Sequence, residues 1–263
     1  MIGVADAIME TRTVIDLKGA TALVTGGTSG ISLATAQALL EKGVNVALNA
    51  RRARPAVVDA LNGHGQGTGA RCIFVAGDTS LPETAAMLVQ ATSEEFGRLD
   101  IVVHSAGGPA PGTALQISPD AWMDAFAVHV HSTFHLFRAA HPLLKVQGGS
   151  VTLLSSAAAL RGCPGTVAYQ VVKASLIQMA RALARDHAAE NIRVNCVAPG
   201  IVRTPFQDSM TEEARLNNLA NRIPLGREGK PADVAAMIVQ LAENDFITGE
   251  TVVLDGGMSM RMV

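Results

Sequence analysis

The stretch Thr25-Gly26-Gly27-Thr28-Ser29-Gly30-Ile31-Ser32 decides the fold of this chain. It follows a short apolar run that is typical of a strand, and it leads into a segment whose apolar residues recur with helical spacing. A strand, a glycine turn and a helix N-terminus in this order form a cradle for a pyrophosphate group, because glycine lets the backbone approach closely and the free N–H groups of the helix face the anion. Turns also use glycine for other reasons, so the prediction depends on the place of this turn in the chain. The residues expected to bind there are Gly26, Thr28, Ser29, Gly30 and Ile31.

Strand-like runs alternate with helix-length segments along the whole chain. Most of these runs are almost continuously apolar, as expected of strands that are covered on both faces of a parallel sheet. The expected strands are Thr21–Thr25, Val44–Asn49, Cys72–Ala76, Ile101–His104, Ser150–Ser155, Arg193–Val197 and Thr251–Leu254. The alternation predicts an α/β fold, a single-domain Rossmann-type doubly wound parallel sheet of about seven strands with helices on both faces. Residues 17–263 are expected to form one dinucleotide-binding and catalytic domain, preceded by an N-terminal arm at residues 1–16.

Composition argues against several classes of protein. The 263 residues carry a formal charge of −2 and only 3% aromatic side chains, so neither a basic nucleic-acid surface nor a base-stacking platform is expected. No apolar run reaches the length of a membrane span, and the N-terminus lacks the pattern of a secretory signal. The three cysteines are far apart, which favours reduced thiols and a cytoplasmic protein. His131 and His135 are four residues apart but lack a third ligand at suitable spacing, so no metal is expected.

The end of the second expected strand bears on the choice of dinucleotide. The adenosine ribose should lie here, and an acidic residue would bond its 2′-hydroxyl and repel a 2′-phosphate. The chain instead has Ala50 followed by Arg51 and Arg52. This pattern favours NADP(H), with NAD(H) as the second candidate. The alternative is that the two arginines form a solvated basic turn before the next helix.

A tyrosine, a lysine and a serine form the candidate catalytic group. Tyr169 and Lys173 are four residues apart, so a helix would place them on one face. Ser156 ends an apolar strand, at the carboxyl edge where open α/β sheets bind ligands. Tyr169 is the only tyrosine in the chain. A tyrosine–lysine pair at this spacing occurs often by chance, whereas three compatible residues at the expected ends of three elements do not.

These motifs together resemble the short-chain dehydrogenase/reductase family, over essentially everything from Leu17 to Ser259. The chain looks similar to the branch that contains 3-oxoacyl-carrier-protein reductases and glucose dehydrogenases. The motifs that carry the resemblance are TGGTSGIS at 25–32, Asp78-Thr79, HSAG at 104–107, Ser156 thirteen residues before Tyr169, YQVVK at 169–173, NCVAPGIVRT at 195–204, IPLGREGKP at 223–231 and FITGETVVLDGG at 246–257.

The resemblance implies a role for each matching residue. Tyr169 would exchange a proton with the substrate oxygen, and Ser156 would orient that oxygen by a hydrogen bond. Lys173 would lower the pKa of the tyrosine and hold the nicotinamide ribose. Asp78 would accept a hydrogen bond from the adenine. The other residues expected at the cofactor are Thr79, Ser105, Ala106, Gly107, Pro199, Gly200, Val202 and Thr204, besides Tyr169 and Lys173 themselves. The alternative for Ser156, Asp78 and Thr204 is that each is only a turn or cap residue.

Three positions depart from the family pattern. Ser32 replaces the third glycine of the turn, which predicts a slight shift of the helix rather than lost binding. His104-Ser105 replaces a pair of asparagines, and Ser105 reaches less far. His129 aligns with the asparagine that holds a water molecule in a proton relay, so it is the fourth candidate catalytic residue. An imidazole can hold or replace that water, but an impaired relay and a purely structural histidine remain alternatives.

The residues therefore predict an NAD(P)-dependent oxidoreductase, a short-chain alcohol dehydrogenase or carbonyl reductase. It would transfer a hydride between the nicotinamide and a secondary alcohol or ketone, with Tyr169 as the acid–base group. The alternative is a catalytically impaired nucleotide-binding regulator or scaffold of the same fold. Residues 205–222 are expected to form a mobile lid over the substrate, and Arg161, Arg203 and Arg215 are candidates to meet an acidic group on it. The family resemblance implies a homo-oligomer, a tetramer in preference to a dimer.

Overall fold

Seven parallel strands form one sheet in the computed structural model, which describes residues 15–52, 54–208 and 210–260. Most of the expected N-terminal arm, residues 1–14, lies outside these described residues. The strands are β1 (Thr21–Thr25), β2 (Asn45–Ala50), β3 (Cys72–Ala76), β4 (Ile101–His104), β5 (Gly149–Leu154), β6 (Ile192–Pro199) and β7 (Thr251–Leu254). Their order is β3-β2-β1-β4-β5-β6-β7, which confirms the predicted doubly wound parallel sheet.

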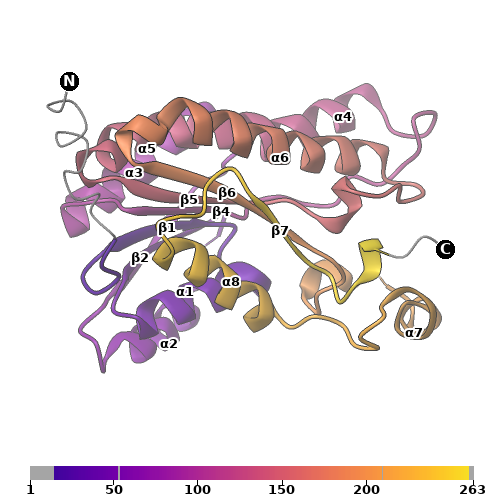
Figure 1. Ribbon diagram of the computed structural model, residues 1–263, viewed down its shortest axis with the longest axis horizontal. Coiled ribbons are helices and arrows are strands. Elements are labelled where there is room, and N and C mark those ends of the chain that lie inside the picture. Colours follow the sequence, from indigo (N-terminus) through magenta and orange to yellow (C-terminus); the bar gives the residue numbers. More distant parts are fainter. Residues whose placement is uncertain (1–14, 53, 209, 261–263) are drawn as a thin grey trace, which may run out of the picture.

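Helices cover both faces of the sheet (Figure 1). The helices are α1 (Gly30–Glu41), α2 (Pro55–Gly65), α3 (Pro82–Phe96), α4 (Pro119–Phe126), α5 (Ser132–Gln147), α6 (Val167–His187), α7 (Glu212–Asn217) and α8 (Pro231–Glu243). α1, α2 and α8 lie on one face, and α3, α5 and α6 lie on the other. None of the described helices is both long enough and apolar enough to cross a membrane.

The apolar run of β1 explains why both faces are covered. Ala22 and Val24 belong to the core that includes α1 and α8, whereas Leu23 belongs to the core that includes α3, α5 and α6. All three are fully buried. Because successive side chains of a strand point to opposite faces, a strand that is apolar at every position needs a layer of helices on each side.

The strand order has a switch point between β1 and β4: β2 and β3 are added on one side of β1, and β4 and the later strands on the other. β1 pairs with β2 on one side and with β4 on the other, and Thr25 lies opposite His104 at the carboxyl ends of these two strands. In open α/β sheets, ligands bind in the crevice outside this switch point. The sheet therefore directs the glycine turn and the loop after β4 toward one place.

Two local features differ from the expected pattern. β5 ends at Leu154, so Ser156 does not lie on the strand but precedes a short 3₁₀ helix at Ala157–Ala159. A π-helix at Ala127–His131 joins α4 to α5 and carries His129. Single π-turns inside helices are rare and occur mainly at functional sites, and the sequence pattern does not distinguish them from ordinary helix.

Candidate active site

The glycine turn after β1 packs tightly against the loop that follows β4. Gly26 has a φ of +78°, and a Cβ atom there would lie 2.8 Å from the backbone nitrogen of Ala106. Gly30 has a φ of +58° and begins α1. Ser29 is the N-cap of this helix, but its side chain makes no capping bond. The first N–H groups of α1 are therefore left for an anion, and the turn fits a pyrophosphate.

Two residues that depart from the family pattern contact each other. The hydroxyl of Ser32, on α1, donates a hydrogen bond of 2.8 Å to the hydroxyl of Ser105. Ser32 is buried, with 3% of its surface exposed. The serine that replaces a glycine thus ties α1 to the loop after β4. The sequence analysis treated these two substitutions as separate and missed the pairing, because they are 73 residues apart in the chain.

His104 holds the carboxyl ends of β1 and β4 together through a chain of buried hydrogen bonds. Its Nδ1 lies 2.9 Å from the Thr25 hydroxyl and its Nε2 lies 2.9 Å from the Ser132 hydroxyl. Ser132 in turn donates to the Val128 carbonyl in the π-helix, so its oxygen accepts from the imidazole Nε2–H. Thr25 also accepts bonds from the backbone N–H groups of Ser105 and Ala106. This network connects the phosphate turn to the segment that carries His129.

The expected adenosine end brings Asp78 near Arg51. The two residues follow the paired carboxyl ends of β3 and β2, where Ala76 lies opposite Ala50. The Asp78 Oδ1 atom accepts bonds from the Ser80 backbone N–H at 3.0 Å and the Ser80 hydroxyl at 2.7 Å. These bonds, with a smaller contribution from Arg51, hold the pKa of Asp78 below its usual value. Asp78 therefore has the turn role that the sequence left open, and its other carboxylate oxygen has no protein partner among the described residues.

Arg51 and Arg52 are both exposed in the bend after β2, and Thr79 lies in the turn after β3. The guanidinium groups of Arg51 and Arg52 can therefore reach a ligand at this edge of the sheet.

Ser156, Tyr169 and Lys173 come together at the same edge. The Ser156 side chain forms a hydrogen bond with the Tyr169 phenol and also caps the short helix after it by accepting from the Ala158 backbone N–H. Lys173 is buried on α6, its Nζ lies 5.7 Å from the centre of the Tyr169 ring, and it donates a bond of 2.7 Å to the Leu154 carbonyl. The predicted helical spacing of the tyrosine and lysine is confirmed, since both lie on α6.

The protonation of this group differs from the expectation. Burial raises the pKa of Tyr169, more than the bond from Ser156 lowers it. The resemblance implied that Lys173 lowers the pKa of Tyr169, but Lys173 is not among the causes of the shift. Burial lowers the pKa of Lys173 itself to about 8, because a charged ammonium is costly inside the protein. The phenol is therefore protonated at neutral pH, and the lysine can release and regain a proton close to neutral pH.

His129 lies against this group and is almost completely buried, with 1% of its surface exposed. Its ring packs edge-on to the Tyr169 ring, with 6.0 Å between the ring centres. Its Nε2 lies 3.0 Å from the Gly108 carbonyl oxygen and 3.3 Å from the Gly108 backbone nitrogen, whereas its Nδ1 has no hydrogen-bond partner among the described residues. Burial lowers the pKa of His129 to about 3, so the ring is neutral. A Cβ atom on Gly107 would lie 2.2 Å from this imidazole, which explains the glycine at that position.

Comparison with known proteins agrees with this arrangement. A family model described as "Enoyl-(Acyl carrier protein) reductase" matches residues 26–259. Dehydrogenase/reductase SDR family member 4 of Caenorhabditis elegans is 33% identical over 256 residues, which cover 93% of this chain and 97% of the relative. The 3-oxoacyl-(acyl-carrier-protein) reductase of Chlamydia muridarum is 32% identical over 244 residues, or 90% of this chain and 96% of the relative.

Solved structures give the same result. The 3-oxoacyl-(acyl-carrier protein) reductase of Brucella melitensis, solved in complex with NAD, has a TM-score of 0.87 at 30% identity, covering 93% of this chain and 98% of that one. A short-chain type dehydrogenase/reductase of Mycobacterium ulcerans has a TM-score of 0.88 at 30% identity, covering 94% of this chain and 92% of that one. The chain belongs to the short-chain dehydrogenase/reductase family. It is therefore an oxidoreductase of a family that uses NAD(P)(H).

The end of β6 and the segment after it contain the residues that the resemblance places at the cofactor, Pro199, Gly200, Val202 and Thr204. Pro199 ends β6, and Gly200 lies so close to Asp255 that a Cβ atom would lie 2.7 Å from the aspartate Cβ. Val202 forms a bridge with Gly229. The Thr204 side chain would lie 3.0 Å from a Cβ atom on Gly30. The segment therefore returns to the phosphate turn, and Gly200 is explained by packing on Asp255. The contact of Pro199, Gly200, Val202 and Thr204 with the cofactor stays a prediction.

The segment expected to act as a lid lies next to Tyr169. It contains a 3₁₀ helix at Pro205–Gln207, helix α7 and a π-helix at Asn218–Arg222. The Phe206 ring centre lies 5.9 Å from the Tyr169 ring centre.

The three arginines considered for an acidic substrate all have partners within the protein. Arg203 and Arg215 bind the carboxylate of Glu228 at 2.9 and 3.1 Å, and Arg161 donates to the Ser259 carbonyl. The sequence could not show this, because Glu228 looks like an ordinary surface acid. These arginines therefore have partners within the protein, while their contact with an acidic substrate group stays a prediction.

Proposed function

We propose that this short-chain dehydrogenase/reductase reduces a ketone to a secondary alcohol with NAD(P)H, and that Tyr169 is its acid. The observation that carries the proposal is the partly exposed, hydrogen-bonded pair of Ser156 and Tyr169 beside the buried Lys173, at the carboxyl edge of the sheet next to the glycine turn. Hydride addition to a carbonyl carbon creates a negative oxygen, and two hydroxyl donors at one place suit that oxygen.

Each residue has a separate task in this reaction. The bound cofactor supplies the hydride. The Ser156 hydroxyl donates a hydrogen bond to the carbonyl oxygen and orients it, and the Tyr169 hydroxyl donates its proton to the same oxygen as charge develops. Lys173 then supplies a proton to the phenolate, for which a pKa of about 8 is suitable.

We place His129 in the path that returns a proton to Lys173. The Nε2 atom lies closer to the Gly108 carbonyl oxygen (3.0 Å) than to the Gly108 backbone nitrogen (3.3 Å), which favours the tautomer with the proton on Nε2. In this tautomer the neutral ring presents Nδ1 as a buried acceptor beside Tyr169. An acceptor at this place can hold a water molecule, the task of the asparagine found in the family. A partly satisfied imidazole fits the working relay better than a purely structural role, because a structural histidine would have both nitrogens bonded.

The protonation state favours the reducing direction. Burial raises the pKa of Tyr169, so at neutral pH the phenol is almost entirely in the protonated form that can donate a proton, and the phenolate is scarce. Oxidation of an alcohol needs the phenolate as the base. Reduction should therefore be faster than oxidation near pH 7, and oxidation should accelerate as the pH rises.

An uncharged ketone is the favoured substrate class. The arginines considered for an acidic group are engaged with Glu228 and Ser259, and Phe206 presents an apolar ring beside Tyr169. Five curated relatives are named as 3-oxoacyl-(acyl-carrier-protein) reductases and one as a tropinone reductase homolog. These names supply the two ketone types to test first, β-keto thioesters and cyclic ketones.

The basic bend after β2 favours NADPH over NADH. Arg51 and Arg52 are exposed, and Ala50 leaves no carboxylate to repel a 2′-phosphate. A charge-assisted hydrogen bond contributes about 1.5–3 kcal/mol, so NADPH should bind about ten- to a hundredfold more tightly.

The first experiment measures nicotinamide absorbance while a panel of ketones is reduced with NADPH or NADH. The panel contains a β-keto thioester, a cyclic ketone and, as the alternative suggested by the family model's description, an enoyl thioester. We expect turnover of at least one ketone, with NADPH preferred, and an Arg51→Ala variant that loses most of that preference. Equal binding of both cofactors would make the arginines a solvated turn and NAD the better assignment. Reduction of the enoyl thioester alone would contradict a carbonyl reductase, and cofactor binding without any turnover would favour the regulator or scaffold.

A further inference from the structure

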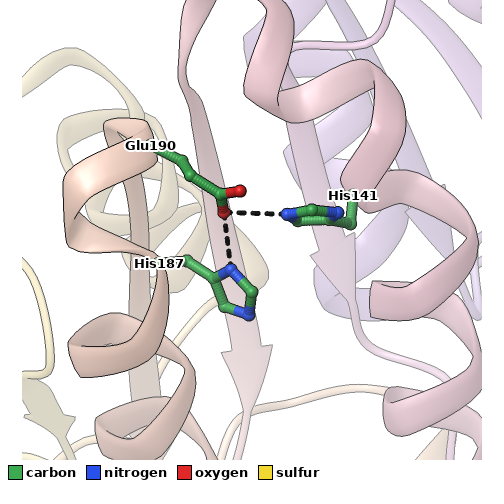
Figure 2. A group of neighbouring side chains, drawn as sticks. All are labelled: His141, His187 and Glu190. Carbon is green, nitrogen blue, oxygen red and sulfur yellow. Dashed lines mark hydrogen bonds and ion pairs between the residues drawn. The ribbon is translucent and has the colours of Figure 1, made fainter.

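Three titratable side chains converge where α5 and α6 end (Figure 2). His141 lies on α5, His187 is the last residue of α6, and Glu190 ends the 3₁₀ helix that follows. The Glu190 Oε2 atom lies 2.8 Å from the His141 Nε2 and 2.6 Å from the His187 Nδ1. The ligand atoms of all three residues lie within 4.8 Å of one another.

The fold holds these side chains in place. α5 and α6 both run toward the amino ends of the strands, so their last turns lie side by side at that edge. The two imidazoles are 4.9 Å apart between ring centres, and both rest against Phe137, whose ring lies 4.9 Å from His187 and 6.1 Å from His141. Each histidine side chain is 24% exposed, so the cluster packs on Phe137 on one side and is open to solvent on the other.

The chemistry of this group matches one class of ligand. Two imidazole nitrogens with one carboxylate oxygen suit borderline divalent metals such as Zn²⁺, whereas Mg²⁺ and Ca²⁺ prefer oxygen ligands alone. Metal–ligand bonds of about 2.0–2.2 Å require donor atoms only slightly farther apart than those of Glu190 and the histidines. The last carbonyls of α6 also favour a cation at this end of the helix.

We propose that His141, His187 and Glu190 form a Zn²⁺ site with three protein ligands, completed by water. The donors of this site are the His141 Nε2, the His187 Nδ1 and a Glu190 carboxylate oxygen. Ligand spacing along the sequence predicts no metal here, because His141 and His187 are 46 residues apart and only the fold brings them together. The bound ion would connect α5 to α6 and stabilise their packing.

A simpler arrangement competes with this one. Both ring N–H groups can donate to the Glu190 carboxylate, which holds its pKa below the usual value and clamps the two helices without a metal. The two arrangements use the same atoms but differ in whether the facing nitrogens carry protons. Zn²⁺ binding needs these nitrogens unprotonated and therefore weakens as the pH falls, whereas the clamp binds no ion.

The site can be tested independently of the proposed catalysis. His187 is 18 residues beyond Tyr169 on the same helix, a separation of about 27 Å at the usual helical rise. An ion at His187 therefore does not touch the proposed active site. The measured quantities are metal binding and thermal stability rather than turnover.

The experiment titrates Zn²⁺ into full-length protein without a histidine tag, followed by calorimetry and elemental analysis, with Mg²⁺ as the negative control. We expect one Zn²⁺ per chain and a melting temperature raised by about 5 °C at a hundredfold excess over Kd. His187→Ala and the milder Glu190→Gln should each weaken binding at least about tenfold. The control is His135→Ala, because His135 is a partly exposed histidine on α5, the helix of His141. This variant should bind Zn²⁺ as the unmodified protein does.

Anomalous diffraction from Zn²⁺-soaked crystals keeps the proposal testable if a variant fails to fold. A peak between His141, His187 and Glu190 is expected. No saturable binding, affinity unchanged in both ligand variants, or a peak only at other histidines would each overturn the proposal in favour of the hydrogen-bonded clamp.

Discussion

His104 and His129 are neutral in the folded protein because both are buried near Lys173. Burial is the largest cause of the shift, and it lowers the pKa of each to about 3. In the unfolded chain a histidine has a pKa of about 6.5. Between these two values the unfolded chain therefore binds more protons than the folded one, and the free energy of unfolding falls as the pH falls.

We predict that stability is full above about pH 6.5 and decreases toward pH 3, with each of these histidines contributing about 1.4 kcal/mol per pH unit within that window. The measurement is urea unfolding at a series of pH values. His129→Asn should flatten this dependence, because asparagine does not titrate. His64→Asn is the control, because His64 is 38% exposed and pairs with Glu41 on the surface. A slope that is the same in all three proteins would contradict the assignment.

At this scale the sequence identified the residues but not their bonds. Tyr169, Lys173 and Ser156 were predicted from spacing, because a helical interval and a strand end have known geometry. The Ser32–Ser105 bond and the path from Thr25 through His104 to Ser132 join segments that only the folded sheet brings together. The pKa of Tyr169 was predicted in the wrong direction, because burial cannot be read from a motif.

At the scale of elements, Glu228 braces the segment that we propose as the substrate lid. Its carboxylate is only 10% exposed and binds both Arg203 and Arg215, one before the segment and one within it. One carboxylate thus ties the start of the lid to α7 in its middle. The lid can open when this brace is weakened, since the segment packs on Tyr169 mainly through Phe206.

We predict that Glu228→Gln makes residues 205–222 exchange backbone hydrogens about tenfold faster, the equivalent of about 1.4 kcal/mol of easier local opening. The KM for the ketone should rise while the affinity for NADPH changes little. Glu212→Gln serves as the matched control, because Glu212 is 67% exposed and bonds Arg215 at 3.3 Å. Unchanged exchange across 205–222 in Glu228→Gln would show that Glu228 is not the brace.

The elements themselves were largely predictable. All seven strands were expected within a few residues, because an apolar run between helices has few other uses. The π-helix at Ala127–His131 was not predicted, because it changes the hydrogen bonding without changing the composition. The end of β5 was placed one residue late, because Ser155 is buried like the strand residues before it and its hydroxyl bonds the Lys173 carbonyl.

At the scale of the whole molecule, β7 is an edge of the sheet and its surroundings are apolar. Phe246 is 93% exposed in the loop before β7, and Val253 on β7 is 39% exposed. An apolar edge strand is usually covered by another chain. This surface supports the homo-oligomer implied by the family resemblance. The preference for a tetramer over a dimer rests on the resemblance.

We predict a tetramer in light scattering at micromolar concentration, and a smaller assembly when Phe246→Asp and Val253→Lys are combined. Charged groups should oppose burial of this surface. Leu115→Asp is the control, because Leu115 is 98% exposed but lies in the loop before α4. A monomeric unmodified protein would contradict the prediction, and a double variant that remains tetrameric would place the interface elsewhere.

The central claim is that Tyr169 transfers the proton that accompanies hydride transfer, and the most direct test is Tyr169→Phe. The substitution removes the transferable proton and little volume. With the ketone that the panel identifies, kcat should fall by about two to four orders of magnitude, while the Kd for NADPH should stay within a few-fold of the unmodified value. Near-normal turnover in Tyr169→Phe would contradict the account.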